Sequence, residues 1–123
     1  MDIYTDGSCI NSRGGWAALL IYDDKEVYIS GGEKQTTNNR MELTAVIQSL
    51  LECERTECTI YSDSLLVINC AQRKWKRNKN LDLWKEFDNI ASSKVIHWEW
   101  VKAHSGNEYN EIVDKIARNE IVK

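Results

Sequence analysis

The hydrophobic pattern of this chain changes its period near residue 36, and this change limits the folds that are open to it. Before it, apolar residues alternate or cluster in short runs at 2–6, 16–22 and 27–30, a pattern that predicts three strands. After it, apolar residues recur at three- and four-residue spacing from Leu43 to Leu51, which predicts a helix. We therefore expect an antiparallel meander followed by a helix.

Turn-forming residues separate these first segments. The first strand is expected to end at Asp6, Gly14-Gly15 to form a turn, and Gly31-Gly32 to close the third strand. Asp23-Asp24-Lys25 is typical of a tight turn between the second and third strands. The pair Asn38-Asn39 is expected to cap the helix, because a short polar side chain accepts a hydrogen bond from the first turn.

The second half of the chain alternates strands and helices. Its pattern predicts a strand at 59–62, helices at 65–71 and 81–91, a strand at 95–101 and a last amphipathic helix at 112–121. A strand–helix–strand crossover makes the fourth strand parallel to the first. We therefore expect an α/β fold, a mixed sheet with helices on its faces, in one domain over residues 1–123.

Four carboxylates stand out against this frame. Asp6 and Asp63 each follow a predicted strand, and ligand sites in sheets with parallel strands form beyond the strands' carboxyl ends. Glu42 and Asp114 lie on predicted helices, roughly 110° from the centre of the apolar stripe at about 100° per residue. Taken singly, each acid is more often a turn former or a solvated side chain, but all four are placed to converge at one end of the sheet.

Four like charges cannot share a site without a cation, because their repulsion raises some of their pKa values unless a metal compensates it. Carboxylate oxygens suit Mg²⁺ or Mn²⁺. Two such ions about 4 Å apart activate a water on one side of a phosphodiester and stabilise the leaving oxygen on the other. The acids therefore predict a metal-dependent phosphodiester hydrolase.

Composition excludes several other classes. Cys9, Cys53, Cys58 and Cys70 form no CxxC pair, so we expect reduced, mostly core thiols rather than disulfides or zinc. The N-terminus has no basic and apolar signal segment, and no apolar run approaches the ~20 residues that span a bilayer. We expect a cytoplasmic protein. The net charge of −3 does not suggest a nucleic-acid-binding protein, but it allows a local basic patch.

Five sequence blocks together resemble type 1 ribonucleases H. They follow the family's order from residue 3 to residue 118, and the string TTNNRMEL is the most specific of them. The blocks are Ile3–Ser8 (IYTDGS), Thr36–Leu43 (TTNNRMEL), Tyr61–Ser64 (YSDS), Trp98–Gly106 (WEWVKAHSG) and Asn110-Glu111 followed by Asp114.

The resemblance implies a five-stranded mixed sheet of order 3-2-1-4-5 with flanking helices. It also implies hydrolysis of the RNA strand of an RNA–DNA hybrid, with divalent metal, to leave 3′-hydroxyl and 5′-phosphate ends. Asp6, Glu42, Asp63 and Asp114 match the family's metal-binding acids, with Glu42 also near the 2′-hydroxyl of the substrate. His104 matches a mobile histidine that assists proton movement or product release. His97 matches no such role and is expected to be a strand residue.

The same matching places substrate-binding residues. Asn11 and Asn39 match positions that touch the minor groove of the hybrid, with Ser64 beside them. Thr37 and Asn38 resemble the pocket that holds a DNA phosphate. Short polar groups suit a wide, shallow minor groove, in which shape and 2′-hydroxyls are recognised rather than sequence. Cleavage is therefore expected to be largely independent of sequence.

The chain departs from the family pattern in three places. The turn at residues 11–15 is about two residues shorter than in the family, Leu65 replaces a common Gln, and the long basic "handle" is reduced to residues 72–80. Five of the seven residues from 73 to 79 are Lys or Arg, with Trp75 among them. A run of charge is usually a solvated loop, but we interpret this one as a minimal handle that binds the hybrid through Lys74, Trp75, Lys76 and Arg77.

Several alternatives remain open at the level of sequence. A non-catalytic hybrid-binding module would lack one of the acids, and none is missing. Integrases and resolvases share the fold but lack the TTNNRMEL and Trp-Val-Lys-x-His patterns. The chain fits either a minimal free enzyme or the ribonuclease H domain of a reverse transcriptase. Nothing in the sequence requires a partner subunit, so we expect a monomer.

Overall fold

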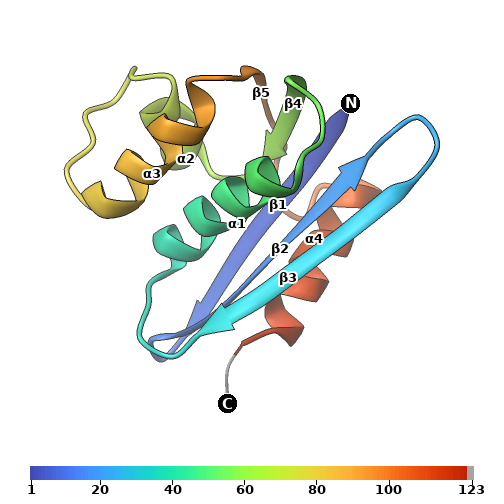
Figure 1. Ribbon diagram of the computed structural model, residues 1–123. Coiled ribbons are helices and arrows are strands. Elements are labelled where there is room, and N and C mark those ends of the chain that lie inside the picture. The colour runs from blue at the N-terminus through green and yellow to red at the C-terminus, as the bar shows by residue number, and fades with distance from the viewer. Residues whose placement is uncertain (122–123) are drawn as a thin grey trace.

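The computed structural model describes residues 1–121 and contains the expected mixed sheet (Figure 1). The elements follow one another as β1 Asp2–Ile10, β2 Arg13–Ile21, β3 Glu26–Glu33, α1 Asn38–Glu52, β4 Glu57–Ser62, α2 Leu65–Ala71, α3 Leu81–Ala91, β5 Val95–Trp100 and α4 Glu108–Asn119. The strand order is β3-β2-β1-β4-β5. Strands β1, β2 and β3 pair antiparallel, while β4 is parallel to β1 and β5 to β4. The predicted α/β fold and its strand order are confirmed.

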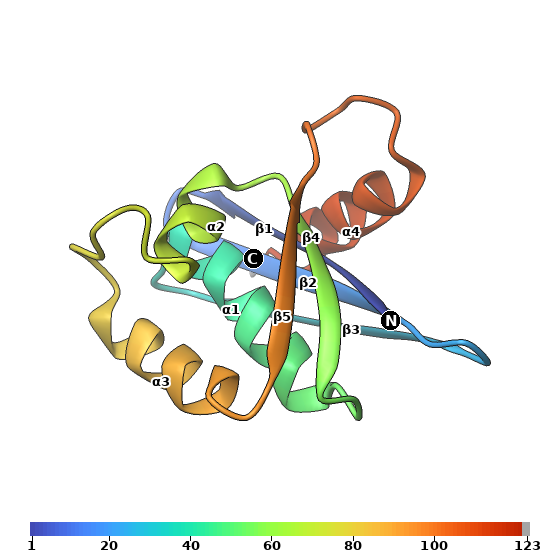
Figure 2. The ribbon, with the colours of Figure 1, turned by 90° about the horizontal axis from the view of Figure 1, so that it is seen from above.

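Helices cover the two faces of the sheet unequally (Figure 2). Helices α1, α2 and α3 cover one face, where a large core includes Ile3, Leu20, Ile47, Ile60 and Phe87. Helix α4 covers the other face, with a smaller core of Tyr4, Ala17, Leu19, Val113 and Ala117. Because the helices lie on the two faces of the sheet, they leave its ends open to solvent (Figure 2).

The hairpin between β1 and β2 differs from the expectation. Its turn is Asn11-Ser12, both with positive φ (52° and 66°), as a tight two-residue hairpin requires. Gly14 and Gly15 lie inside β2. A Cβ on Gly15 would stand 2.1 Å from the carbonyl oxygen of Ala117 in α4, so this glycine is needed for close packing and not for a turn.

The helix boundaries agree with the sequence pattern for α2 and α3 but not for α4, which spans Glu108–Asn119 and not the predicted 112–121, because Asn107 caps it by accepting a hydrogen bond from the Asn110 N–H at 3.0 Å. Helices α2 and α3 span the predicted residues. The cap of α1 is Thr37 and not Asn38-Asn39, because the Thr37 hydroxyl accepts a hydrogen bond from the backbone N–H of Arg40 at 3.2 Å. Among residues 1–121, no helix combines the length and the apolar character that crossing a membrane requires.

Candidate active site

Asp6 lies in the middle of β1, and not at its end as expected. The strand continues to Ile10 because its antiparallel pairing with β2 continues that far, to Arg13. The parallel pairing with β4 stops earlier, at Tyr4 opposite Tyr61. Asp6 therefore projects just beyond the parallel part of the sheet, where the crevice predicted for parallel strands does form.

The other carboxylates come from three further elements. Glu42 lies in the first half of α1, Asp63 follows β4 directly, and Asp114 lies on α4. All four acids line one open depression together with Asn38, Ser64, Ala103, His104, Arg118, Gly7 and Ser8. The four acids that the sequence predicted to converge therefore line the same depression.

Gly7 brings α1 close enough to β1 for Glu42 to reach Asp6. A Cβ on Gly7 would stand 2.3 Å from the backbone nitrogen of Glu42, so any other residue would push α1 away from the strand. The Gly7 N–H donates to Oδ1 of Asp6 and to Oε1 of Glu42, both at 2.9 Å. One backbone donor thus fixes two carboxylates at the same point.

Three of the acids are close enough to share one cation. Asp6, Glu42 and Asp63 each offer a carboxylate oxygen, and these atoms lie within 4.8 Å of one another. Asp6 and Glu42 are almost fully buried. Oε2 of Glu42 is buried and, among the described residues, has no hydrogen-bond partner. A buried carboxylate oxygen without a donor is costly, and a divalent cation is the ligand that would satisfy it.

Burial perturbs the ionisation of these acids. It raises the pKa of Asp6 to about 7, and Asp63 and Asp114 add to this rise, whereas the neighbouring carboxyl group of Glu42 opposes it. Burial also raises the pKa of Glu42 well above its usual range, with Asp6 adding to the effect. The pKa of Asp63 is raised by burial and then by Asp114. Oxygen-only donors that are buried and mutually repelling fit a hard cation such as Mg²⁺.

Asp114 differs from the other three acids in its partner, although it lies near enough to raise the pKa of both Asp6 and Asp63. It lines the depression, but it is outside the group whose oxygens lie within 4.8 Å. Its Oδ2 instead forms an ion pair with Nη2 of Arg118, one helical turn further along α4, at 2.8 Å. The sequence pattern predicted that four acids converge, and all four line the depression; the structure adds that one of them, Asp114, is already paired.

The remaining residues of the predicted site fall at or beside the depression. His104 is exposed on the loop between β5 and α4, with a positive φ of 54°, and it lines the depression with Asn38 and Ser64. Ser64 also caps α2 by accepting a hydrogen bond from the Val67 N–H at 3.2 Å. Asn11 is exposed at the tip of the β1–β2 hairpin. Asn39 lines a neighbouring groove with the basic segment.

Comparison with known proteins places the chain in a family. A family profile described as RNase H matches residues 1–122. A protein of Wolbachia pipientis wMel named Ribonuclease H is 47% identical, across 98% of this chain and 94% of the relative. A Ribonuclease H of Acetivibrio thermocellus is 44% identical, across 100% and 95%. The chain belongs to the ribonuclease H family.

Solved structures agree on the fold. The N-terminal RNase H domain of a Mycobacterium tuberculosis protein is similar with a TM-score of 0.84 at 23% identity, across 97% of this chain and 92% of that one. RNase H1 of Halobacterium salinarum is similar with a TM-score of 0.81 at 19% identity, across 97% and 95%.

Membership of the ribonuclease H family decides between the alternatives left open by the sequence. Because ribonucleases H are nucleases, this membership excludes the non-catalytic binding module, and it places the chain outside the integrases and resolvases.

Relative to the expected ribonuclease H handle, the basic segment at residues 72–80 is only partly available for a ligand. Lys74, Trp75 and Lys76 are exposed. Arg77 instead turns inward, and its side chain is only 7% exposed. Its Nη1 pairs with Oδ2 of Asp88 at 2.7 Å and its Nε donates to the Cys70 carbonyl at 2.9 Å. The predicted role of Arg77 as a surface contact is therefore replaced by a structural one.

Two residues of the ribonuclease H site were missed by the sequence reasoning. Arg118 was detectable, because a basic residue four positions after an acid on a helix commonly pairs with it. Trp100, at the end of β5, donates from Nε1 to the carbonyl oxygen of Asp63 at 3.2 Å. No local signal could have shown this contact, since it joins residues 37 positions apart.

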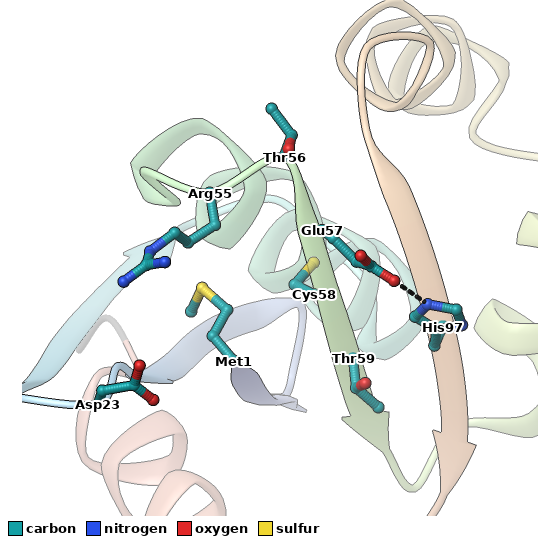
Figure 3. Close-up of a pocket in the computed structure, with 8 residues that line it drawn as sticks. All are labelled: Met1, Asp23, Arg55, Thr56, Glu57, Cys58, Thr59 and His97. Atoms are coloured by element: carbon teal, nitrogen blue, oxygen red, sulfur yellow. Dashed lines mark hydrogen bonds and ion pairs between the residues drawn. The ribbon is translucent and has the colours of Figure 1, made fainter.

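The opposite end of the sheet has a different character (Figure 3). The hollow there is lined by residues that include Met1, Arg55, Glu57 and His97. His97, a strand residue as predicted, has its Nε2 2.8 Å from Oε2 of Glu57, and both side chains are more than half exposed. This end shows no convergence of buried acids among the described residues. The converging buried acids of this ribonuclease H therefore lie at the end that holds Asp6.

Proposed function

We propose that this ribonuclease H hydrolyses the RNA strand of RNA–DNA hybrids with two Mg²⁺ ions, for which Mn²⁺ can substitute, and leaves 3′-hydroxyl and 5′-phosphate ends. Asp6, Glu42, Asp63 and Asp114 would hold the metal. The observation that carries the proposal is the convergence of three carboxylates, one with an unsatisfied oxygen, in a depression open to solvent. Bound ions would supply an activated water and stabilise the leaving 3′-oxygen.

The residues of the chain divide the remaining tasks. The Gly7 N–H orients Asp6 and Glu42, so that both carboxylates face the depression before any ligand arrives. The Trp100 indole holds the backbone of Asp63 from the neighbouring strand. Such fixed positioning is what lets charged groups act without reorganising during the reaction.

His104 is proposed to assist proton movement or product release. It lies on the rim of the depression, on a loop whose backbone takes up positive φ values at His104 and Gly106. Histidine is the side chain that enzymes use most often to transfer protons to and from a reacting group. Its exposed position allows it to approach a bound strand and to leave again.

Polar groups around the depression are proposed to hold the hybrid. Asn11, Asn39 and Ser64 would contact the minor groove, and Thr37 with Asn38 would bind a DNA phosphate at the start of α1. The first backbone N–H groups of a helix lack intrahelical partners and favour anions. These contacts read shape rather than base identity, which supports sequence-independent cleavage.

The basic segment is proposed to bind the backbone of the DNA strand through Lys74, Trp75 and Lys76. These three side chains are exposed, and ammonium groups on flexible stems suit phosphate contacts. Arg77 would act indirectly, by fixing the segment against α3. We also infer a monomeric, cytoplasmic enzyme over residues 1–123, since all four acids come from one chain and the four cysteines are free thiols.

A gel assay tests this proposal. A labelled RNA–DNA hybrid is incubated beside single-stranded RNA, duplex RNA and duplex DNA, each with Mg²⁺, Mn²⁺ or EDTA. We expect cleavage of the RNA in the hybrid alone, blocked by EDTA, with products that a polymerase extends from their 3′ ends. Cleavage in EDTA, or no cleavage of the hybrid by folded protein with either metal, would contradict the proposal.

A further inference from the structure

We propose that Arg118 lowers the affinity of the acidic depression for divalent cations, by occupying Asp114 in the free protein as a built-in competitor. The inference rests on the proposed metal-dependent function and concerns a residue to which that function gives no role. Its basis is the ion pair between Nη2 of Arg118 and Oδ2 of Asp114, at 2.8 Å.

The pair is positioned to compete for a cation and not merely to stabilise α4. Arg118 lines the depression together with Asp6, Glu42, Asp63 and Asp114. Among residues 1–121 it is the only basic residue in that lining apart from His104, and a guanidinium is a permanent positive charge. Any cation that approaches Asp114 therefore meets a fixed positive charge already bound there.

The pair can also open. The Arg118 side chain is 57% exposed, whereas that of Asp114 is 19% exposed, so the arginine can swing into solvent while the acid stays facing the depression. Exposed ion pairs one turn apart on a helix are weak. A divalent cation can therefore displace Arg118 when a second negative group, such as a phosphate of the substrate, lies beside Asp114 and strengthens the binding of the cation.

The ion pair distinguishes Asp114 from the three acids whose oxygens lie within 4.8 Å of one another. In the free protein the three converging acids form one cation site, and Asp114 is neutralised by the chain itself. The consequence is a site that holds its full complement of metal only with substrate bound. Arg118 thus sets the metal concentration at which the site fills.

The test is a calorimetric titration of the free, metal-stripped protein with Mn²⁺, comparing the wild type with Arg118→Gln. We expect the variant to bind Mn²⁺ about tenfold more tightly, or to bind one ion more, because removing one nearby positive charge changes such an affinity by roughly that factor. Thermal melting gives a second readout. The variant is expected to melt at a lower temperature than the wild type in EDTA and to gain more from added Mn²⁺.

Two controls separate competition from a general effect of charge. Lys115→Gln removes the same charge from the same helix, next to Asp114, but Lys115 does not line the depression; its Mn²⁺ affinity should match the wild type. Arg118→Lys keeps the charge and should bind Mn²⁺ as weakly as the wild type. Equal Mn²⁺ binding by Arg118→Gln and the wild type would overturn the inference alone, as would an equal gain in Lys115→Gln. Absence of Mn²⁺ binding in all folded variants would overturn the proposed metal centre as well.

Discussion

The acidic depression and the basic segment at residues 72–80 are both charged, but they are built in opposite ways. The acids come from four separate elements and reach the depression from the body of the fold, two of them almost fully buried. The lysines of the basic segment lie on one exposed loop. The single buried cation of that loop, Arg77, is fully occupied by Asp88 and by backbone carbonyls.

This difference separates functional from structural charge. A buried charge with a complete set of partners, such as Arg77, stabilises the packing of neighbouring elements and needs no ligand. A buried acid with an unsatisfied oxygen, such as Glu42, is costly to ionise until a cation compensates it, and its pKa is raised for that reason. We therefore propose that hydrolysis takes place in the depression and that the exposed lysines bind the hybrid.

The largest expected effect is on the chemical step. Asp6→Asn should lower kcat on a hybrid by about a thousandfold or more, because losing metal stabilisation of the transition state costs several kcal/mol. The asparagine keeps the size of the side chain and an oxygen for the Gly7 N–H, so the fold and hybrid binding should survive. Single-turnover kinetics measure the loss.

Asp2→Asn is the matched control for that variant. It makes the same substitution on the same strand, at the end of β1 remote from the depression. Its kcat should stay close to that of the wild type. A similar loss in both variants would show that the strand and not the metal site is responsible.

The next effect is on stability and separates Arg77 from its neighbours. Arg77→Ala should lower the free energy of unfolding by about 3 kcal/mol, since it removes a buried charge with its hydrogen bonds and a guanidinium that lies 4.4 Å from the centre of the Trp84 ring. Arg73 pairs with the same Asp88 but is 67% exposed. Arg73→Ala should therefore cost less than about 1 kcal/mol. Urea unfolding measures both, and equal losses would contradict the structural role of Arg77.

The third effect concerns the uncompensated acids. Because the folded-state pKa of Asp6 is raised to about 7, protonation of Asp6 favours the folded protein, and this contribution is lost as pH rises through 7. In EDTA, Asp6 alone should therefore make the protein about 2 kcal/mol more stable at pH 5.5 than at pH 8. The figure follows because pH 5.5 lies about 1.5 units below the pKa of Asp6, and each unit corresponds to about 1.36 kcal/mol. Glu42, whose pKa is also raised, acts in the same direction.

Saturating Mg²⁺ should largely abolish this loss of stability between pH 5.5 and pH 8, because the cation compensates the acids as they ionise. Asp6→Asn in EDTA should also show less of it. Urea unfolding at the two pH values is the measurement. Stability that rises with pH over this range in EDTA would refute the assignment of buried, uncompensated acids.

The smallest effect is on substrate affinity. Lys74→Ala combined with Lys76→Ala should weaken hybrid binding about tenfold at moderate salt and reduce the log–log salt slope by about 1.8, two contacts at about 0.9 each. The cleavage rate at saturating enzyme should not change. Lys25→Ala, which removes an exposed lysine from the β2–β3 turn, should leave the slope unaltered. An unchanged slope in the double variant would remove the basic segment from the binding surface.

Much of this architecture was predictable from local signals. The lengths of α2 and α3 follow from apolar periodicity, and the strand order follows from the resemblance to the family. Gly14-Gly15 misled the prediction because a pair of glycines signals either a turn or close packing, and only the approach of α4 to Gly15 distinguishes the two. The end of β1 was placed too early because the pairing with β2 outlasts the pairing with β4.

The candidate site was predictable to the extent that its residues carry their own signal. Glu42 and Asp114 were placed by helical geometry, and the depression contains both. The inward turn of Arg77 depends on Trp84 and Asp88 of another helix, which a run of basic residues does not reveal. The pairing of Asp114 with Arg118 was detectable from their spacing on one helix, but that the pair lines the depression depends on how α4 packs against the sheet.

The central claim is that the depression at Asp6 is a metal centre, and diffraction at the manganese absorption edge tests it most directly. Crystals of the free protein are soaked in Mn²⁺ and the anomalous map is calculated. The account predicts a peak coordinated by oxygens of Asp6, Glu42 and Asp63. Manganese bound elsewhere in the crystal while that depression stays without a peak would contradict it.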